Sequence, residues 1–365
     1  MKIFFYGSSL LSSYWNGAAT YYRGLLRELA ALGHEITFYE PDAFDRQQHR
    51  DMEPPDWARV VVYDATEDAL RRVVAEAAQA DVVVKASGVG VFDDALITGL
   101  VAAARPDAIR IFWDVDAPAT LAEIQPQPGH PLRRALPALD YVLTYGGGPP
   151  VVAAYEALGA RRCQPVYNAL DPTTHHPVPP DPRFAADLGF LGNRLPDREA
   201  RVEEFFLRAA AARPLQRFLL GGSGWEQKSR PANVALLGHV YTRDHNAFNV
   251  TPRAVLNIAR DSMAATGYSP ATRVFEACGA GACLITDAWT GLGQFLEEGQ
   301  EVLVARDGRD VAEHLAALTP ERARAIGEAA RQRVLRDHTY ALRAVEVDRL
   351  LRAHRAMAPA LDAAR

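Results

Sequence analysis

The chain has 365 residues, which is too long for one ordinary hydrophobic core and suits two domains. Hydrophobic residues make up 48% and charged residues 23%, the composition of a soluble globular protein. The formal net charge of -5 argues against a nucleic-acid-binding protein that depends on bulk electrostatic attraction.

The cysteines and the N-terminal residues favour a cytoplasmic location. Cys163, Cys278 and Cys283 have no paired spacing, which favours buried free thiols in a reducing cytosol. The opening residues, MKIFFYGSS, are apolar only briefly and predict a first strand, not a signal peptide. No apolar run approaches membrane-spanning length. We therefore expect a cytoplasmic protein without a membrane-spanning segment.

Short apolar runs alternate with helical segments through the first half of the chain. The runs expected to be strands cover residues 2–7, 35–40, 59–63, 81–85, 108–116, 140–145 and 164–169. Asn16 and Gly17 open a helix that we expect to continue to Leu32, with Leu25 and Leu29 on its buried face. Alternation of strands and helices predicts an α/β domain with a parallel sheet.

Two charged residues in this half stand at the ends of predicted strands. Lys85 closes a run of valines, so it must contact a ligand, pair with a carboxylate or extend to water. Asp116 ends the strand over 108–116. It has two interpretations, a general base toward an acceptor hydroxyl or a cap for the helix that follows Pro118.

A proline-rich segment separates the two halves. Residues 170–187 contain five prolines and predict a stiff, extended linker. His175 and His176 lie in it without other ligands, so we expect no metal site there, and no metal cluster elsewhere. The predicted domains are residues 1–170 and 171–340, followed by a C-terminal helix over 341–365.

The second half repeats the strand and helix pattern. Strands are expected at residues 188–191, 217–220, 233–240, 254–259, 283–286 and 301–304, with a helix from Pro196 to about Ala212. Gly192, Asn193 and Arg194 follow the first of these strands, and Arg198 begins the helix. Ligands of such sheets lie beyond the carboxyl ends of the strands, so this is a position for a diphosphate.

The stretch from Ser262 to Asp287 carries the most information. It predicts a polar loop, then a helix capped by Ser269 with Pro270 at its first position, ended by Gly279 and Gly281. Arg273 and Glu276 fall in its first two turns. An Arg there can neutralise a diphosphate, and a carboxylate can accept two hydrogen bonds from a ribose. The alternative is an ordinary amphipathic helix with a surface glutamate.

These residues carry a family resemblance. Gly267-Tyr268-Ser269-Pro270, Arg273-Val-Phe-Glu276-Ala, Gly281 and Asp287 together resemble the nucleotide-sugar half of GT-B glycosyltransferases, in the CgeB-like (spore maturation protein) branch of group 1. Many such enzymes have two glutamates eight positions apart. Glu276 matches the second, which in the family usually holds the donor ribose. Tyr268 occupies the position of the first, so the chain departs from the pattern there.

The resemblance implies a fold and a set of donor contacts. The fold would be two Rossmann-like domains facing a cleft, with the C-terminal helix crossing back to the first domain. Asn16 and Gly17 would approach the phosphate or sugar of the donor, and the backbone of Val240 would contact the base. Tyr268 and Ser269 would lie beside the donor.

The resemblance also implies an activity. A sugar would pass from a nucleotide diphosphate sugar, with a UDP-sugar as the first expectation, to a hydroxyl or amine acceptor that the sequence does not identify. Arg273, with Arg194 or Arg198 and the helix N-terminus, would stabilise the leaving diphosphate without a metal. The alternatives are a nucleotide-sugar 2-epimerase on the same fold and a two-domain binding protein without catalysis.

Overall fold

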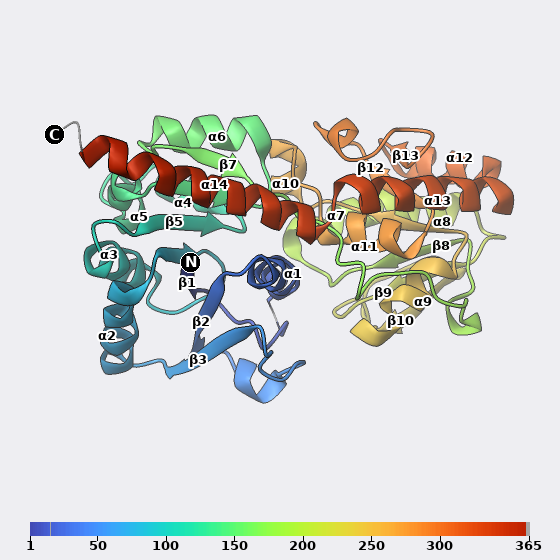
Figure 1. The fold of residues 1–365 in the computed structure, drawn as a ribbon. Coiled ribbons are helices and arrows are strands. Elements are labelled where there is room, and N and C mark those ends of the chain that lie inside the picture. Colours follow the sequence, from blue (N-terminus) through green and yellow to red (C-terminus); the bar gives the residue numbers. More distant parts are fainter. Residues whose placement is uncertain (15, 363–365) are drawn as a thin grey trace. The chain divides into compact units, whose positions relative to one another are not determined.

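The computed structural model describes residues 1–14 and 16–362, and in it the chain forms two compact units. Unit 1 contains Met1–Tyr167 together with the segment from Tyr340 onward, and unit 2 contains Asn168–Thr339. Each unit has a parallel sheet covered by helices (Figure 1). The predicted α/β class with two Rossmann-like units is therefore confirmed.

Unit 1 is built on a seven-stranded sheet in the order β3-β2-β1-β4-β5-β6-β7, in which all neighbouring strands are parallel. The strands are β1 Lys2–Tyr6, β2 Glu35–Asp42, β3 Ala58–Asp64, β4 Val82–Ala86, β5 Ile109–Asp114, β6 Tyr141–Thr144 and β7 Cys163–Pro165. The central strand β4 is buried along its whole length because helices cover both faces of the sheet, and Lys85 is its one charged residue. The strand order reverses between β1 and β4, and ligands bind beyond the carboxyl ends of strands at such a point.

The helices of unit 1 come from both ends of the chain. They are α1 Ala18–Ala31, α2 Glu67–Glu76, α3 Asp93–Ala103, α4 Ala117–Ile124, α5 Pro131–Ala135, α6 Gly148–Ala157 and α14 Tyr340–Asp362, with 3-10 turns η1 Arg46–His49, η2 Ala77–Gln79 and η3 Leu136–Ala138. The helix predicted over 341–365 corresponds to α14, and residues 363–365 lie outside the described residues.

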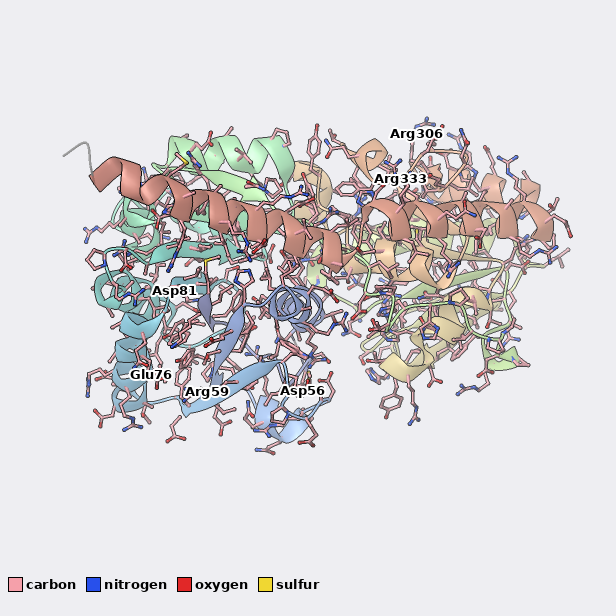
Figure 2. The ribbon with its side chains drawn as sticks, viewed as in Figure 1. Asp56, Arg59, Glu76, Asp81, Arg306 and Arg333 are labelled. Atoms are coloured by element: carbon pink, nitrogen blue, oxygen red, sulfur yellow. The ribbon has the colours of Figure 1, made fainter. Side chains whose placement is uncertain are left out.

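Three contacts attach α14 to the rest of unit 1. Its first residue, Tyr340, packs on Gly24 of α1, where a Cβ would come within 2.2 Å of the Tyr340 ring. Further along, Asp348 Oδ1 lies 2.8 Å from Nε2 of the buried His34. Near its end, Arg355 donates to Asp81 at 2.7 Å (Asp81 is labelled in Figure 2). Residues from the two ends of the chain therefore share one core.

Unit 2 is built on a six-stranded parallel sheet in the order β10-β9-β8-β11-β12-β13. The strands are β8 Leu188–Leu191, β9 Phe218–Gly221, β10 Val234–Gly238, β11 Ala254–Asn257, β12 Leu284–Asp287 and β13 Leu303–Ala305. Its core includes Phe206, Trp225 and Leu256, each fully buried. The strand order again reverses, here between β8 and β11, at the place where the predicted donor residues lie.

The helices of unit 2 are mostly short. They are η4 Pro182–Phe184, α7 Pro196–Val202, a π-helical segment η5 Glu203–Leu207, α8 Arg208–Ala212, η6 Thr242–Asp244, α9 His245–Val250, α10 Asp261–Thr266, α11 Thr272–Ala280, η7 Leu292–Gln294, α12 Gly308–Ala317 and α13 Pro320–Asp337. Across the described residues of both units, no helix combines the length and the apolar character needed to cross a bilayer.

Three helix predictions in unit 2 need correction. The helix expected over residues 196–212 is interrupted by the π-helical turn η5. The polar loop expected before Ser269 contains helix α10. This helix has no buried residue, so its sequence lacks the apolar periodicity from which a helix is predicted. Helix α11 begins at Thr272, because the Ser269 hydroxyl bonds to the Gly267 carbonyl and caps nothing.

The end of α11 is held by close packing against α13. Gly281 ends α11 in the left-handed conformation, with φ 84°, and its carbonyl oxygen would lie 2.2 Å from a Cβ on Gly327 of α13. Gly279 stays within the helix, and a Cβ there would lie 2.2 Å from the Leu170 side chain. These glycines let other segments approach α11 closely enough to fix its position.

This packing predicts that Gly327→Ala destabilises the protein. Alanine gains about 1 kcal/mol of helix propensity, but the backbone of Gly281 must move to admit the methyl group, at a cost of about 1–3 kcal/mol or more. We expect a lower midpoint in thermal unfolding by calorimetry. Gly293→Ala is the control, since no heavy atom lies within 4 Å of its new Cβ. Equal midpoints for the two variants would contradict the packing argument.

Candidate functional site

The carboxyl ends of the central strands of unit 2 carry a group of charged side chains. Arg198 lies on α7, which follows β8, and Arg273 and Glu276 lie on α11, between β11 and β12. These three residues, here called the Arg198–Arg273–Glu276 cluster, are those that the sequence places at strand ends and helix starts. They are close enough to change one another's pKa, as described below.

The two arginines of the cluster are only partly exposed, and neither forms an ion pair with a described acid at contact distance. Burial lowers the pKa of both guanidinium groups, and the charge of Arg273 lowers that of Arg198 further. Among the described residues, neither guanidinium donates a hydrogen bond or forms an ion pair, and Arg198 Nε and Arg273 Nη1 are buried without a partner. Two like charges held together out of water attract an anion strongly.

The acids nearest to Arg198 are already occupied. Asp197 Oδ2 accepts from Arg260 Nε at 2.5 Å, and Asp287 Oδ2 accepts from Arg201 Nη2 at 2.6 Å. Gly192, at the end of β8, leaves room for the Arg198 guanidinium, since a Cβ there would lie 2.7 Å from Arg198 Nη1. Gly192 thus gives Arg198 the space it occupies, and the acids that attract it, Asp197 and Asp287, each bond to another arginine.

Glu276 is the acidic member of the cluster and is only 9% exposed. Burial raises its pKa, but the charges of His175, Arg273 and His245 outweigh burial and hold the pKa below its ordinary value. Its carboxylate accepts no hydrogen bond from any described residue, which leaves both oxygens available to a ligand's hydroxyl groups.

Two histidines surround Glu276, and the sequence analysis missed their grouping. Single ligand atoms of His175, His245 and Glu276 all lie within 4.8 Å of one another. The prediction that His175 lacks other ligands is therefore wrong, because the fold brings it two partners from distant segments. Burial, followed by the charge of Arg273, lowers the pKa of His245 to about 4, so this imidazole is neutral near pH 7.

The structure does not bring Arg194 to the cluster. Its Nε and Nη2 donate to the two Glu199 oxygens, each at 2.7 Å, and Glu199 also accepts from Lys228. Asn193 Oδ1 accepts from the Ser223 N–H at 3.0 Å, which joins the ends of β8 and β9. Arg194 and Asn193 thus have structural partners, and Arg198 is the cation of this loop that is left for a ligand.

The other predicted donor contacts of unit 2 border the cluster. The Val240 carbonyl accepts from His245 Nε2 at 3.2 Å. The backbone of Tyr268 is in the left-handed conformation, with φ 49°. Its ring packs against Gly291, where an added Cβ would lie 2.2 Å from the nearest ring carbon. Left-handed tyrosines are rare and strained, and such strain often occurs at binding sites. Ser269 is buried with its hydroxyl bonded to Gly267.

The predicted donor contacts of unit 1, Asn16 and Gly17, lie directly before α1. Asn16 is 6% exposed, and its amide bonds to the carbonyls of Ser9 and Ser12 while its oxygen accepts from the Ser8 hydroxyl. Its side chain therefore folds the loop before α1. Gly17 precedes α1 with open space around it, since no heavy atom lies within 4 Å of a Cβ there.

The aspartate that organises the start of α4 through its side chain is Asp114, whereas the sequence suggested Asp116 as the helix cap. Asp116 precedes α4, but its side chain makes no capping hydrogen bond. The carboxylate of Asp114, with no exposed surface, instead accepts from the Asp116 N–H and from the hydroxyls of Ser87, Thr120 and Tyr155. Of the two interpretations of Asp116, the side-chain cap is therefore wrong.

Lys85 lies at the base of a cavity in unit 1. The cavity has a volume of about 600 Å³, and its lining includes Asp93 of α3, Glu123 of α4 and His130, which precedes α5. Lys85 Nζ donates to Asp93 Oδ1 and to the Ala86 carbonyl, each at 2.6 Å. Of the three alternatives stated for Lys85, pairing with a carboxylate is the one observed. A cavity of this size suits a small ligand such as a monosaccharide or disaccharide.

Comparisons with known proteins bear on the fold and on the second half of the chain. Residues 198–349 match a protein-family model described as "Glycosyl transferase-like". HepE from Anabaena, solved with UDP and glucose, matches with a TM-score of 0.66 at 13% identity over 97% of this chain and 100% of HepE. Sucrose-phosphate synthase from Thermosynechococcus elongatus matches with a TM-score of 0.67 at 14% identity over 97% and 98%.

A third structure extends the set. AviGT4, a glycosyltransferase involved in avilamycin A biosynthesis, matches with a TM-score of 0.62 at 16% identity over 98% of both chains. No curated protein sequence matches the chain closely enough to count as a relative. The matches do not single out the CgeB-like branch. The chain has the two-domain GT-B fold, and its residues 198–349 match a glycosyl transferase-like family model.

Proposed function

We propose that this protein is a glycosyltransferase that moves a sugar from a nucleotide diphosphate sugar to a hydroxyl or amine acceptor. The observation that carries the proposal is the Arg198–Arg273–Glu276 cluster, in which two largely buried guanidinium groups and one buried carboxylate lack partners. The match of residues 198–349 to a glycosyl transferase-like family supports sugar transfer over epimerisation and over binding without catalysis.

Each member of the cluster suits one part of the donor. Arg198 and Arg273 would donate to the diphosphate, together with the N-terminal N–H groups of α11. Glu276, one turn further along α11, would accept hydrogen bonds from two ribose hydroxyls. Unit 2 is therefore the proposed donor unit, and unit 1, with its cavity at Lys85, is the proposed acceptor unit.

The chemistry of the transfer follows from these positions. The bond between the sugar and the diphosphate breaks as the acceptor attacks, and negative charge develops on the departing diphosphate. Two preorganised guanidinium groups stabilise that charge, so no metal is needed for the step. We propose a UDP-sugar as donor, because HepE is described with UDP and with UDP-glucose on a similar fold.

Branch and compartment remain part of the proposal. The motif from Gly267 to Asp287 supports placement in the CgeB-like branch. The three cysteines are free and buried, which supports a reducing cytoplasmic location.

The first test is nucleotide binding. A thermal-shift series with UDP, GDP, ADP, CMP and dTDP, with and without Mg²⁺, should show stabilisation by one diphosphate that does not depend on Mg²⁺. A ligand at about a hundredfold over its dissociation constant stabilises by roughly 2.7 kcal/mol, which is a readable shift. A flat series would remove the donor-site assignment.

Asp116 provides a second test, in unit 1. We propose it as the general base toward the acceptor, because it follows β5 at the carboxyl edge of the sheet. Asp116→Asn should lower turnover by about 10²- to 10⁴-fold while UDP affinity stays at the wild-type value. Radiolabelled sugar transfer measures the first quantity and calorimetry the second. Wild-type turnover in this variant would exclude the assignment.

A further inference from the structure

Three side chains in unit 2 converge in the manner of a metal site. His175 comes from the segment before β8, His245 begins α9, and Glu276 lies on α11. One ligand atom from each lies within 4.8 Å of the others. Ligand atoms around a tetrahedral zinc ion lie about 3.4 Å apart, so small rotations of these side chains would let one ion contact all three. His175 is 5% exposed and Glu276 9%, so the group is built into the unit rather than assembled from mobile surface chains.

The backbone around His175 fixes its position. Its N–H donates to the Asp171 carbonyl at 3.0 Å, within a turn that the Asp171 carboxylate also supports. Gly279 of α11 lies directly beside this turn, since a Cβ there would come within 3.1 Å of the His175 carbonyl oxygen. The close approach at Gly279 brings the imidazole of His175 to the helix that carries Glu276.

Hydrogen bonds leave each side chain with a lone pair available. His245 Nε2 lies 3.2 Å from the Val240 carbonyl, which can only accept, so Nε2 carries the hydrogen and Nδ1 has the lone pair. His175 Nδ1 lies 3.0 Å from the Thr174 hydroxyl, which leaves Nε2. A ligating histidine typically bonds a backbone carbonyl or a similar group through its other nitrogen, as both do here.

We propose that His175, His245 and Glu276 bind a divalent transition metal ion such as Zn²⁺. Two imidazoles and one carboxylate form a ligand set that zinc accepts, with a fourth position open to water. The same set disfavours Mg²⁺, which prefers oxygen ligands and octahedral geometry. The positive charge of Arg273, which acts on both His245 and Glu276, opposes the metal and weakens its binding.

The inference has a regulatory consequence that rests on the proposed function. Glu276 is also the proposed ribose ligand, so metal and donor compete for one carboxylate. Zinc would then inhibit sugar transfer by excluding the donor, although the transfer itself uses no metal. Metal binding alone does not depend on the proposed function, because it requires only the three side chains.

The test is calorimetric titration of the full-length protein with ZnCl₂ in the absence of nucleotide. We expect one ion per chain in the wild type and no binding of MgCl₂ at this site. His175→Gln and His245→Gln should each weaken zinc binding by more than about 100-fold, beyond what loss of a supporting hydrogen bond costs. The matched control is His176→Gln, which changes the exposed neighbouring histidine and should leave zinc affinity unchanged.

Several outcomes would overturn the proposal. They are absence of zinc binding in the wild type, wild-type affinity in both His→Gln variants, or equal weakening in the His176 control. Circular dichroism of each variant shows whether it folds. If either variant fails to fold, the absorption spectrum of the wild type loaded with Co²⁺ tests the site instead. Bands of a tetrahedral ion would support the proposed ligands, and bands of an octahedral, water-rich ion would contradict them.

Arg273→Gln separates the metal site from the donor site. Removing this positive charge should strengthen zinc binding and weaken UDP binding, two changes of opposite sign from one substitution. Weaker zinc binding in Arg273→Gln would contradict the assignment of Glu276 and His245 as ligands. If zinc binds as expected and no nucleotide does, the proposed function fails and the metal site stands.

Discussion

Replacing Arg273 by glutamine is expected to weaken UDP binding by about 30- to 150-fold. The guanidinium is largely buried without a partner, so the hydrogen bonds that it forms with a diphosphate are made in a poorly solvated place. Hydrogen bonds to charged groups contribute about 1.5–3 kcal/mol, and each 1.4 kcal/mol is a factor of ten in affinity. Isothermal calorimetry with UDP measures the effect directly.

Arg194→Gln is the matched control for this prediction. Arg194 lies in the loop after β8, near the proposed donor position, but its Nε and Nη2 donate to Glu199 and its Nη1 donates to the Gly224 carbonyl. Its loss should change UDP affinity by less than about threefold, the range of an exposed ion pair. If the two substitutions weaken UDP binding equally, then the lack of partners at Arg273 does not identify the diphosphate site.

The same Arg273 substitution should stabilise the protein when no ligand is present. Burial lowers the pKa of Arg273 despite the nearby charge of Glu276, so the folded state opposes its positive charge. Because the cost of burial exceeds the attraction to Glu276, replacing this ion by a neutral residue should stabilise the protein by about 1 kcal/mol. Without nucleotide, calorimetry should show a higher unfolding midpoint for the variant than for the wild type. With saturating UDP, the variant should have the lower midpoint of the two.

Asp114→Ala is expected to have the largest effect on stability, a loss of about 3–5 kcal/mol. The fully buried carboxylate accepts four hydrogen bonds, from one backbone N–H and three hydroxyls, and these join β4, β5, α4 and α6. Removing it leaves buried donors without acceptors, each at a cost of about 1–3 kcal/mol. The measurement is the free energy of unfolding in urea. A loss below about 1 kcal/mol would contradict the role of Asp114.

Asp114 also predicts a pH dependence. Burial raises its pKa above the ordinary value of 3.8, because the desolvation cost exceeds the benefit of its hydrogen bonds. The folded state therefore holds the proton more tightly than the unfolded state, and this contribution to stability is complete below pH 3.8 and lost as pH rises through the folded pKa. The wild type should lose stability relative to Asp114→Asn across that interval. A constant difference between them would show that Asp114 does not titrate there.

The strands of both sheets were predictable from the sequence. Each is a short apolar run, because strands covered on both faces need no polar residues, and β8 has the bounds that were expected. Helix starts were less predictable. Ser269 and Pro270 form a common helix-start signal, but two left-handed residues, Gly267 and Tyr268, turn the chain first and the helix begins three positions after Ser269.

The candidate site was predictable only along single segments. Arg273 and Glu276 share one helix, so their spacing showed that they belong together. The grouping of Glu276 with His175 and His245 depends on how three distant segments pack, through contacts such as Gly279 against Leu170, and no local pattern encodes that. Likewise the sequence could not show that Arg194 has a partner and Arg198 has none, because both precede the same helix.

The division of the chain into units has a consequence for biosynthesis. Unit 2 lies between two parts of unit 1 in the sequence, and its own ends are joined where the Leu170 N–H donates to the His338 carbonyl at 2.8 Å. During translation, all of unit 2 is synthesised before Tyr340. Tyr340 is the residue that packs on Gly24 of α1. We therefore expect unit 1 to complete its fold only after α14 has been made, so the N-terminal strands should not form a finished unit ahead of unit 2.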